Sequence, residues 1–428
     1  MTAATLALLL ATLPAPDTLR LPELQDAALA RDPRAAQLAL QEAAAGLRLG
    51  NLGAQRLPQL ALRGEGTRQS DVTTIPIRLP GVQAPEPPRS RYQAALNVDQ
   101  LVYDGGAIGR RREVERARLA EEQAGVRAAL FALREEVTEA FFAAFLLQER
   151  QAEVGALIED LEARLATVRS GVRAGAALPG DTAAVQAELL RARQLRAEAA
   201  ADRRAALAVL AELTGRPAGE GDVLALPALG GAVARVRAAG GAAGVRDRPE
   251  YARFERTRER LLREAGVVAA RTRPQVQAFG QLGLGRPGPF LLFDDGVNDF
   301  WMVGIRAQWQ PWTWGTDRRE RELLRVQQQV AATEEAAFTA RLERQVQDEL
   351  AAMERLEAAL ESDERIITLR EQVERQARRQ FEERVITADQ YVDVRTDVFE
   401  ARLARQRHRV ELARARARYL TTLGVELR

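Results

Sequence analysis

Two stretches of the sequence contain residue types that could catalyse a reaction or bind a nucleotide. GLGRPG, from Gly283 to Gly288, matches a dinucleotide-binding fingerprint, which works only where a helix begins directly after the glycines. Pro289 follows instead, so we interpret this stretch as a flexible loop. His408, the only histidine, lies between two arginines on a charged segment, where a general base would need an orienting partner. We expect a solvated His408 without partners, and no enzyme activity.

A third stretch, DDGVND from Asp294 to Asp299, contains carboxylates that could bind a calcium ion. The same residues are also typical of an Asp/Gly turn at the tip of a hairpin, and we favour the turn. The chain has no cysteine, which excludes disulfides and thiolate metal sites. The sequence therefore predicts no cofactor and no metal site.

The charges of the chain are nearly balanced. There are 62 Lys and Arg residues against 60 Asp and Glu residues, a formal net charge of +2, and the two signs are interspersed. Binding of a nucleic acid requires a basic excess on one face. We therefore expect no nucleic-acid partner.

All four tryptophans of the chain lie between Phe300 and Gly315. Apolar and polar residues alternate here, which is typical of a strand with one apolar face. Trp301 and Trp309 would be about 26 Å apart in a strand, close to the height of about 25 Å of the apolar band of a membrane barrel with aromatic rims. The apolar face would consist of Trp301, Val303, Ile305, Ala307 and Trp309.

Three more segments alternate in the same way and are expected to be strands. A half-exposed antiparallel sheet in water would give the same pattern for any one of them. Four such strands, each next to a very long helix, favour a membrane instead. The apolar positions are Leu60 and Leu62 in the first segment, Tyr92, Ala94, Leu96 and Val98 in the second, and Val276, Ala278, Leu282 and Leu284 in the third.

Two segments without proline, 106–173 and 316–384, are rich in helix-forming residues. Each would be a helix about 100 Å long, which is more than a compact core can cover. Val137, Phe141 and Phe145 form a narrow apolar stripe suited to coiled-coil-like packing. Shorter helices are expected at 22–50, 181–213, 249–271 and 387–423. No uninterrupted apolar run is long enough to span a membrane as a helix.

The sequence contains the same plan twice. LNVDQLVYDGG ends at Gly106, and IRAQWQPWTWG ends at Gly315, 209 residues later. ELTG at Gly215 and TTLG at Gly424 have the same offset, and LPGD, which we match to ITAD, is offset by 208. We expect two repeats, 17–215 and 247–424, with a linker at 216–246 and a tail at 425–428.

Residues 1–16 have some features of an export signal. They contain an apolar core from Leu6 to Leu13 and small residues near Ala15, but no Arg or Lys precedes the core. Either the true start lies upstream, or the segment begins an ordinary apolar element. We expect export.

The chain resembles the outer membrane efflux protein family, the TolC-like channels. The resemblance is carried by the doubled plan and by the order of its motifs: the strand endings LVYDGG and WQPWTWG, the turns LPGD and ITAD, and the helix endings ELTG and TTLG. The resemblance covers nearly the whole chain and implies a mainly α fold with a β-barrel portion. Three chains would each contribute four strands to a 12-stranded transmembrane β-barrel. The duplicated long helical hairpins would form an α-barrel in the periplasm.

The function implied by this resemblance is that of a passive exit duct in the cell outer membrane, as part of a tripartite efflux or type I secretion system. The implied partners are two further copies of the chain, a periplasmic adaptor protein, an inner-membrane pump and outer-membrane lipid. The alternative is a soluble periplasmic coiled-coil scaffold or tether. A tether would not need four strands.

The resemblance also implies roles for individual residues. The residues expected to face lipid are Trp301, Ile305, Trp309 and Tyr92. The turns LPGD and ITAD would be the tips that contact the adaptor, through Leu178, Pro179, Ile386 and Thr387. Asp389 and Asp393 would line the periplasmic aperture.

Two points about the turns are open at this stage. Thr387 and Gln390 can form a capping box, and the helix dipole favours an acidic residue such as Asp389 in the first turn. Asp389 could therefore have a purely local role. The family often has a glycine shortly before the turn; our alignment gives Gly175 in the first repeat and Glu383 in the second.

Overall fold

The computed structural model of the chain describes residues 18–72, 87–240, 245–291, 293–294 and 296–427. They form mainly helices, with one four-stranded and one two-stranded sheet. The expected export signal and most of the proline-rich loop between the first two long strands lie outside the described residues. A search of the described helices for one that is long and apolar enough to cross a membrane found none.

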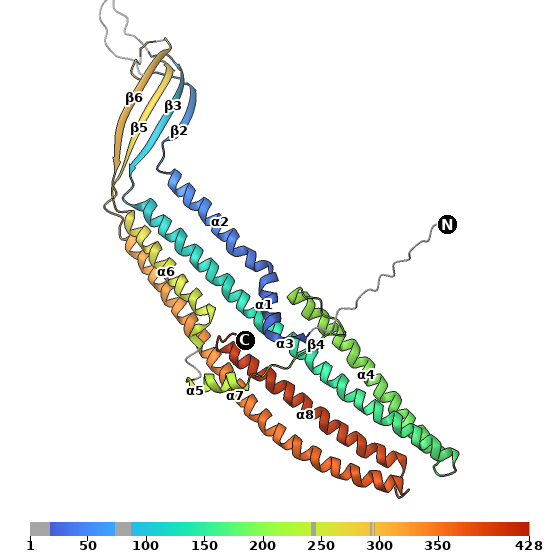
Figure 1. Cartoon of the computed structure of the whole chain (residues 1–428). Coiled ribbons are helices and arrows are strands. Elements are labelled where there is room, and N and C mark those ends of the chain that lie inside the picture. The colour runs from blue at the N-terminus through green and yellow to red at the C-terminus, as the bar shows by residue number, and fades with distance from the viewer. Residues whose placement is uncertain (1–17, 73–86, 241–244, 292, 295, 428) are drawn as a thin grey trace, which may run out of the picture. The chain divides into compact units, whose positions relative to one another are not determined.

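The chain divides into two compact units (Figure 1). Unit 1 comprises Met1–Gln37, Val126–Tyr251 and Glu335–Arg428, and unit 2 comprises Leu38–Gly125 and Ala252–Glu334. The two longest helices, α3 (Ala107–Arg173) and α7 (Thr316–Glu382), contribute residues to both.

Unit 2 contains an antiparallel sheet with the strand order β2-β3-β5-β6. A strand is present at each of the four expected positions, because the alternating apolar residues can all point to one side. The prediction of a loop for GLGRPG is wrong for Gly283–Arg286, which form the end of β5, and confirmed for Pro287 and Gly288, which follow the strand. The strands are β2 (Gln59–Arg68), β3 (Ser90–Tyr103), β5 (Gln275–Arg286) and β6 (Asn298–Gln308).

The helices of unit 2 are held together mainly by ion pairs. Arg48 on α2 (Pro33–Ala54) lies 2.8 Å from Glu115 on α3. Arg260 on α6 (Pro249–Ala270) pairs with Glu121 on α3. A small apolar cluster of Leu261, Val268 and Leu324 joins α6 to α7.

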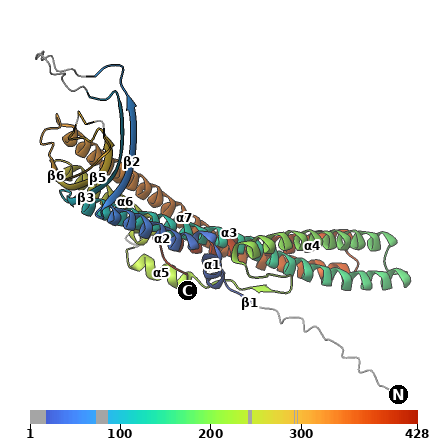
Figure 2. The same cartoon turned by 90° about the horizontal axis from the view of Figure 1, so that it is seen from above.

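Unit 1 is a bundle of paired helices. Figure 1 and Figure 2 show α4 (Pro179–Thr214) lying along α3, where Arg193 and Glu162 are 2.7 Å apart. The helix α8 (Ala388–Thr422) lies along α7, where Arg402 and Glu371 are 2.7 Å apart. The predicted stripe on α3 is buried in the core of this bundle, as the complete burial of Val137 and Phe141 shows.

The helix predicted at 22–50 is in fact two helices, α1 (Leu21–Arg31) and α2. Asp32 between them has an extended ψ of 125°, because a residue before proline avoids the helical region. The Asp32 carboxylate accepts a hydrogen bond from the backbone N–H of Arg34 at 2.7 Å. Pro33 is then the first residue of α2, a position that proline favours.

Three short elements were not predicted. β1 (Thr18–Leu19) and β4 (Val223–Leu224) form a two-residue parallel pair. The helix α5 (Gly230–Ala238) lies in what we expected to be a linker. Strands of two residues have no periodicity that a sequence pattern could reveal.

The two halves of the chain repeat one another closely in structure. The helices α3 and α7 are both 67 residues long and begin 209 residues apart, and α2 and α6 are both 22 residues long. The same offset relates four pairs of residues with positive φ: Gly105 with Trp314, Gly106 with Gly315, Gly175 with Arg384, and Gly215 with Gly424. Our alignment of Glu383 with Gly175 is therefore wrong by one residue.

Candidate functional site

The four predicted lipid-facing residues lie on or next to the sheet. Trp301 and Ile305 are on β6, Tyr92 is on β3, and all three side chains are exposed. Trp309 follows the last residue of β6, is also exposed, and donates a hydrogen bond from Nε1 to the Thr272 carbonyl at 3.0 Å. Their contact with lipid stays a prediction.

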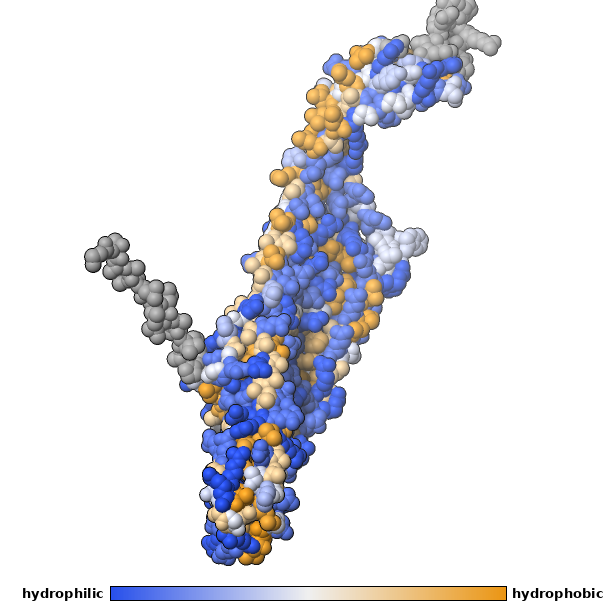
Figure 3. Space-filling view, turned by 90° about the vertical axis from the view of Figure 1, so that its right-hand side faces the viewer, coloured by the Kyte–Doolittle hydropathy of each residue, from blue (hydrophilic) through white to orange (hydrophobic). Residues whose placement is uncertain are grey.

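One face of the sheet carries a continuous apolar row. Trp301 is opposite Leu282, which is opposite Leu96, which in turn is opposite Leu62. Their side chains are exposed by 68, 60, 41 and 81%. Figure 3 shows hydrophobic residues gathered along one margin of the sheet region. Contiguous exposed apolar surface of this kind marks contact with a partner or a membrane.

On the opposite face, aromatic rings cover glycines. Phe279 is paired with Gly304 and Phe300 with Gly283. A Cβ on Gly304 would lie 2.7 Å from the Phe279 ring, and one on Gly283 would lie 2.8 Å from the Phe300 ring. The Arg306 guanidinium lies 5.0 Å from the centre of the Phe279 ring. These two positions therefore require glycine, and Arg306 packs on the sheet.

The two helical turns of unit 1 lie beside one another. Leu178, Ile386 and Thr387 all line one groove of about 630 Å³ between the end of the α3–α4 hairpin and the end of the α7–α8 hairpin. Pro179 is the first residue of α4 and does not line the groove. Leu178 is exposed and Ile386 is half-buried. The structure thus brings three of the four predicted adaptor contacts together.

The helix caps at these turns show that LPGD and ITAD were matched one residue out of step. The Asp181 carboxylate accepts from the Leu178 N–H at 3.0 Å, and the Gln390 side chain accepts from the Thr387 N–H at 3.1 Å. Asp181 and Gln390 therefore occupy the same position, 209 rather than 208 residues apart. Both serve as the third residue of a capping arrangement.

Asp389 and Asp393, the predicted aperture residues, take no part in the hydrogen bonds of the helix cap. Thr387 Oγ1 accepts from the Gln390 N–H at 3.3 Å, so Thr387 and Gln390 form the capping box. Asp389 and Asp393 are exposed, one turn apart on α8, and neither has a hydrogen bond or ion pair with another described residue. Asp389 is in the first turn, where the helix dipole favours a negative charge.

A polar network near the tips, which the sequence did not reveal, joins three helices. Arg164 on α3 donates to the Tyr391 hydroxyl at 2.7 Å, and this hydroxyl donates to Glu374 on α7 at 2.9 Å. The Arg164 guanidinium lies 4.3 Å from the centre of the Tyr391 ring. Arg378 also pairs with Glu374 at 2.9 Å. Spacing indicates only the pair of Glu374 and Arg378, four residues apart on α7; Arg164 and Tyr391 come from other helices, so their part in the network has no local signal.

Burial and hydrogen bonding act in opposite directions on the pKa of Glu374. Burial alone would raise it, but the hydrogen bonds from Tyr391 and Arg378 outweigh burial and hold the pKa of this carboxyl below its usual value. Burial raises the pKa of the Tyr391 hydroxyl. Glu374 is therefore ionised and Tyr391 neutral at neutral pH.

Glu349, on the same helix as Glu374, has the opposite shift. Burial raises the pKa of its carboxyl, although Thr422 and Gln345 donate hydrogen bonds to Oε1 at 2.9 and 3.1 Å. The other carboxylate oxygen, Oε2, is buried without a hydrogen-bond partner among the described residues. One carboxyl of α7 is thus stabilised as an anion and another is destabilised.

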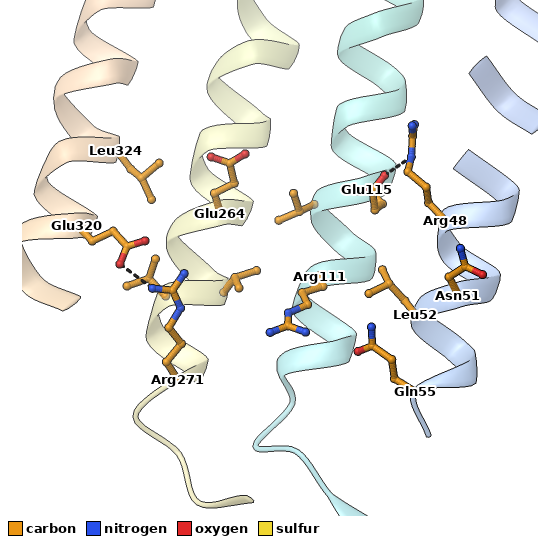
Figure 4. Close-up of a pocket in the computed structure, with 13 residues that line it drawn as sticks. Arg48, Asn51, Leu52, Gln55, Arg111, Glu115, Glu264, Arg271, Glu320 and Leu324 are labelled. Carbon is orange, nitrogen blue, oxygen red and sulfur yellow. Dashed lines mark hydrogen bonds and ion pairs between the residues drawn. The ribbon is translucent and has the colours of Figure 1, made fainter. Parts of the chain in front are cut away.

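Unit 2 contains a cavity of about 470 Å³ lined by α2, α3, α6 and α7 (Figure 4). Leu52 and Leu324 contribute apolar surface, and the charged lining residues are Arg48, Arg111 and Arg271 with Glu115, Glu264 and Glu320. Arg271 lies 2.7 Å from Glu320. Arg111 is the one of these arginines without a carboxylate partner among the described residues. The charges are balanced, so the cavity as a whole does not select an anion.

The stretches considered for chemistry have structural explanations. His408 is not solvated and free as expected, since its Nδ1 lies 2.7 Å from Asp363 Oδ2 across α7 and α8. Asp294 accepts hydrogen bonds from the Gly296 N–H and the Asn298 side chain, at 2.9 and 3.0 Å, as in an Asx turn. The described residues contain no group of three or more acidic, His or Cys side chains suited to a metal ion.

The chain is similar in fold to solved outer membrane channels. A CusC structure covers 95% of this chain and 92% of its own at 15% identity, with a TM-score of 0.70. The open state of the MtrE outer membrane channel of Neisseria gonorrhoeae covers 96 and 90% at 21% identity, with a TM-score of 0.67. The outer membrane protein VceC of Vibrio cholerae covers 95 and 97% at 16% identity, with a TM-score of 0.66.

A sequence comparison points to the same family. No curated protein matches the chain, but the family model of the outer membrane efflux protein matches residues 24–216. This range contains β2, β3, α3 and α4, so it includes half of the sheet and one complete helical hairpin. Residues 24–216 therefore match the model of the outer membrane efflux protein family, and the fold of the described chain is similar to that of the solved outer membrane channels.

Proposed function

We propose that this chain is the outer-membrane exit duct of a tripartite efflux or type I secretion system. Three copies would close one 12-stranded barrel in the outer membrane, and their helices would extend the channel into the periplasm. An adaptor protein and an inner-membrane pump would deliver the substrate and supply the energy. The chain itself would conduct passively.

The apolar row across the sheet is the observation that carries this proposal. Trp301, Leu282 and Leu62 belong to three different strands and are all more than half exposed. The 11 residues of β6 span about 36 Å along the strand, or about 25–30 Å of height at the tilt of a membrane barrel. A soluble tether would expose this face to water, so the row favours the channel over the scaffold.

The free edges of the sheet support a closed trimer. Among the described strands, β2 and β6 each have a neighbour on one side only. In lipid, an unpaired strand edge leaves backbone groups without hydrogen bonds, and closure into a barrel removes such edges. Pairing of β6 with β2 of the next copy would satisfy the backbone groups of both edges.

The exposed apolar residues of α7 in the same unit would also pack on the neighbouring copy. They are Leu323, Val326 and Val330.

The remaining roles follow from this arrangement. Residues 17–215 and 247–424 would be the two repeats, 216–246 the equatorial segment and 425–428 the tail. The groove between the hairpin ends supports an adaptor contact at Leu178, Ile386 and Thr387. Asp389 and Asp393 would narrow the aperture around the threefold axis.

Cell fractionation followed by sedimentation in mild detergent tests the proposal. Material that stays with the outer membrane after a salt wash and sediments as a homotrimer supports the channel. Material in the soluble periplasmic fraction, or a stable folded monomer in detergent, would favour the scaffold and contradict the channel.

A further inference from the structure

The connections between the sheet and its helices in unit 2 are rich in arginine. They contain three acidic residues, Asp104, Asp317 and Glu320. The arginines, here called the junction arginines, are Arg56 before β2, Arg110, Arg111 and Arg112 at the start of α3, Arg271 and Arg273 before β5, and Arg318, Arg319 and Arg321 at the start of α7.

Arginine is an unfavourable choice for the start of a helix. The N-terminus of a helix carries a partial positive charge, so cations in the first turn are repelled and anions are favoured. Arg318 and Arg319 are the third and fourth residues of α7, and Arg110 is the fourth residue of α3. Another source of negative charge is needed to offset this repulsion.

The nearby carboxylates supply only part of this charge, since Glu113 pairs with Arg110 at 3.1 Å and Glu320 with Arg271 at 2.7 Å. Asp104 accepts hydrogen bonds from the N–H groups of Gly106 and Ile108, at 2.9 and 2.5 Å, so it caps α3. Asp317 is only 8% exposed. Of the nine junction arginines, only Arg110 and Arg271 have an ion pair with a described carboxylate. Arg273 and Arg321 donate hydrogen bonds to the backbone carbonyls of Gly105 and Asp317. The other five have neither an ion pair nor a side-chain hydrogen bond with a described residue: Arg112 is half-buried, and Arg56, Arg111, Arg318 and Arg319 are exposed.

Aromatic side chains lie in the same connections. Tyr103, Trp309, Trp312 and Trp314 are all exposed, and the rings of Trp312 and Trp314 contact each other edge to face at 5.9 Å. Tryptophan and tyrosine are typical of the boundary between hydrocarbon and lipid headgroups. The headgroup region beyond this boundary is about 5–7 Å thick, and the fourth residue of a helix lies about 5 Å from its start.

We propose that the junction arginines bind the phosphate groups of anionic phospholipids in the leaflet next to the helices. This inference rests on the proposed membrane location of the sheet. Guanidinium groups bind phosphate through two parallel hydrogen bonds, and basic residues at a membrane surface attract anionic lipids. In a trimer, the junction arginines of three copies would surround the barrel.

The tryptophans of the chain make the proposal directly measurable. All four lie on β6 or in the connection after it, so lipids with brominated chains bound at this surface would quench their fluorescence. The purified trimer is reconstituted with brominated phosphatidylcholine or with brominated phosphatidylglycerol, each mixed with its unbrominated form. The ratio of the two binding constants measures the preference for the anionic lipid.

The test variant replaces the four arginines at the starts of α3 and α7 that have neither an ion pair nor a side-chain hydrogen bond with a described residue: Arg111→Gln, Arg112→Gln, Arg318→Gln and Arg319→Gln. The control variant removes the same amount of charge from the same two helices, far along the sequence from the sheet: Arg127→Gln, Arg344→Gln, Arg355→Gln and Arg375→Gln. The four control arginines are exposed, as are three of the four test arginines, and none has an ion pair with a described carboxylate. Sedimentation confirms that each variant is a folded trimer.

We expect the wild type and the control to prefer phosphatidylglycerol by about fivefold or more, and the test variant to lose the preference to within about twofold of unity. High salt should weaken the wild-type preference. A test variant that keeps the wild-type ratio, or a control that loses it equally, overturns the proposal. Absence of quenching by either lipid in the wild type would instead contradict the membrane location itself, and with it the proposed function.

Discussion

Gly175 and Arg384, 209 residues apart, have the same left-handed backbone conformation, with φ of +69° and +62°. Each lies two residues after the last residue of a 67-residue helix. The next residue closes the same hydrogen bond in both turns, from Ala176 N to Gly171 O and from Val385 N to Gln380 O, each at 2.7 Å. The second repeat therefore keeps the Schellman geometry of the first without its glycine.

Replacement of Arg384 by glycine should stabilise the chain. An L-residue in the left-handed region costs about 1–2 kcal/mol, whereas glycine costs about 0.5–1 kcal/mol through the entropy of the unfolded chain. We expect Arg384→Gly to raise the free energy of unfolding by about 0.5–1 kcal/mol, measured by urea unfolding followed by circular dichroism.

Gly175→Ala is the matched control, because a Cβ at Gly175 would have no atom within 4 Å. Its effect is therefore that of the backbone alone, and we expect destabilisation by about 1 kcal/mol. Destabilisation by both substitutions would show that Arg384 makes side-chain contacts that outweigh its backbone strain.

The two faces of β6 should respond differently to charge. Ile305 is 76% exposed on the apolar face, and Ile305→Arg should cost about 2–4 kcal/mol in lipid, as arginine does near the bilayer midplane. Its neighbour Arg306 packs on Phe279, so Arg306→Gln should cost only the cation–π contact, about 0.5–1 kcal/mol. Unfolding titrations in lipid vesicles measure both. Equal costs, or the reverse order, would mean that the faces are assigned wrongly.

Two glutamates of α7 should give opposite dependences of stability on pH. The pKa of Glu374 is lowered in the folded state, so its contribution to stability is present above its unfolded pKa and is lost as the pH falls through the folded value. Glu374→Gln should therefore flatten the loss of stability on acidification. At neutral pH it should cost about 1–2 kcal/mol, because it weakens the charge-assisted hydrogen bonds that the buried carboxylate accepts from Tyr391 and Arg378.

The pKa of Glu349 is raised in the folded state, so acidification from neutral pH relieves an unfavourable buried charge. Glu349→Gln should raise the free energy of unfolding at neutral pH and have little effect below the unfolded pKa, since the amide oxygen can still accept from Thr422. Unfolding curves at several pH values measure both variants. Parallel curves for Glu349→Gln and the wild type would show that Glu349 is neutral, or solvated by water, already at neutral pH.

Local patterns predicted most of the secondary structure. Alternation placed the four strands of the sheet, and the absence of proline placed α3 and α7, because each pattern repeats over many residues. The break at Asp32 could have been predicted from Pro33, but the surrounding helical pattern concealed it. The pairing of β1 with β4 could not have been predicted, since it joins two-residue segments far apart in the chain.

The candidate sites were less predictable because they depend on contacts between helices. The capping residues Thr387 and Gln390 were identified from their spacing, since a cap is local. Asp363 as the partner of His408, and Arg164 as the partner of Tyr391, come from other helices. The match of LPGD to ITAD is also wrong by one residue, because both motifs end in an acidic residue and only the cap geometry separates them.

The role of Asp389 can be separated from that of the helix cap. The capping box is made by Thr387 and Gln390, so Asp389→Asn should leave the free energy of unfolding nearly unchanged, apart from a dipole effect of about 0.3–1 kcal/mol. Three Asp389 carboxylates close to one axis would attract cations. We therefore expect Asp389→Asn to reduce the cation preference in single-channel recordings and to weaken block by multivalent cations. Gln390→Ala is the control: it removes the side-chain half of the capping box, the bond from the Thr387 N–H to Gln390 Oε1, should lower stability by about 0.5–1 kcal/mol, and should leave the selectivity as it is. Unchanged selectivity of Asp389→Asn in a stable trimer would remove Asp389 from the aperture and leave Asp393, one turn further along α8, as the residue to replace next.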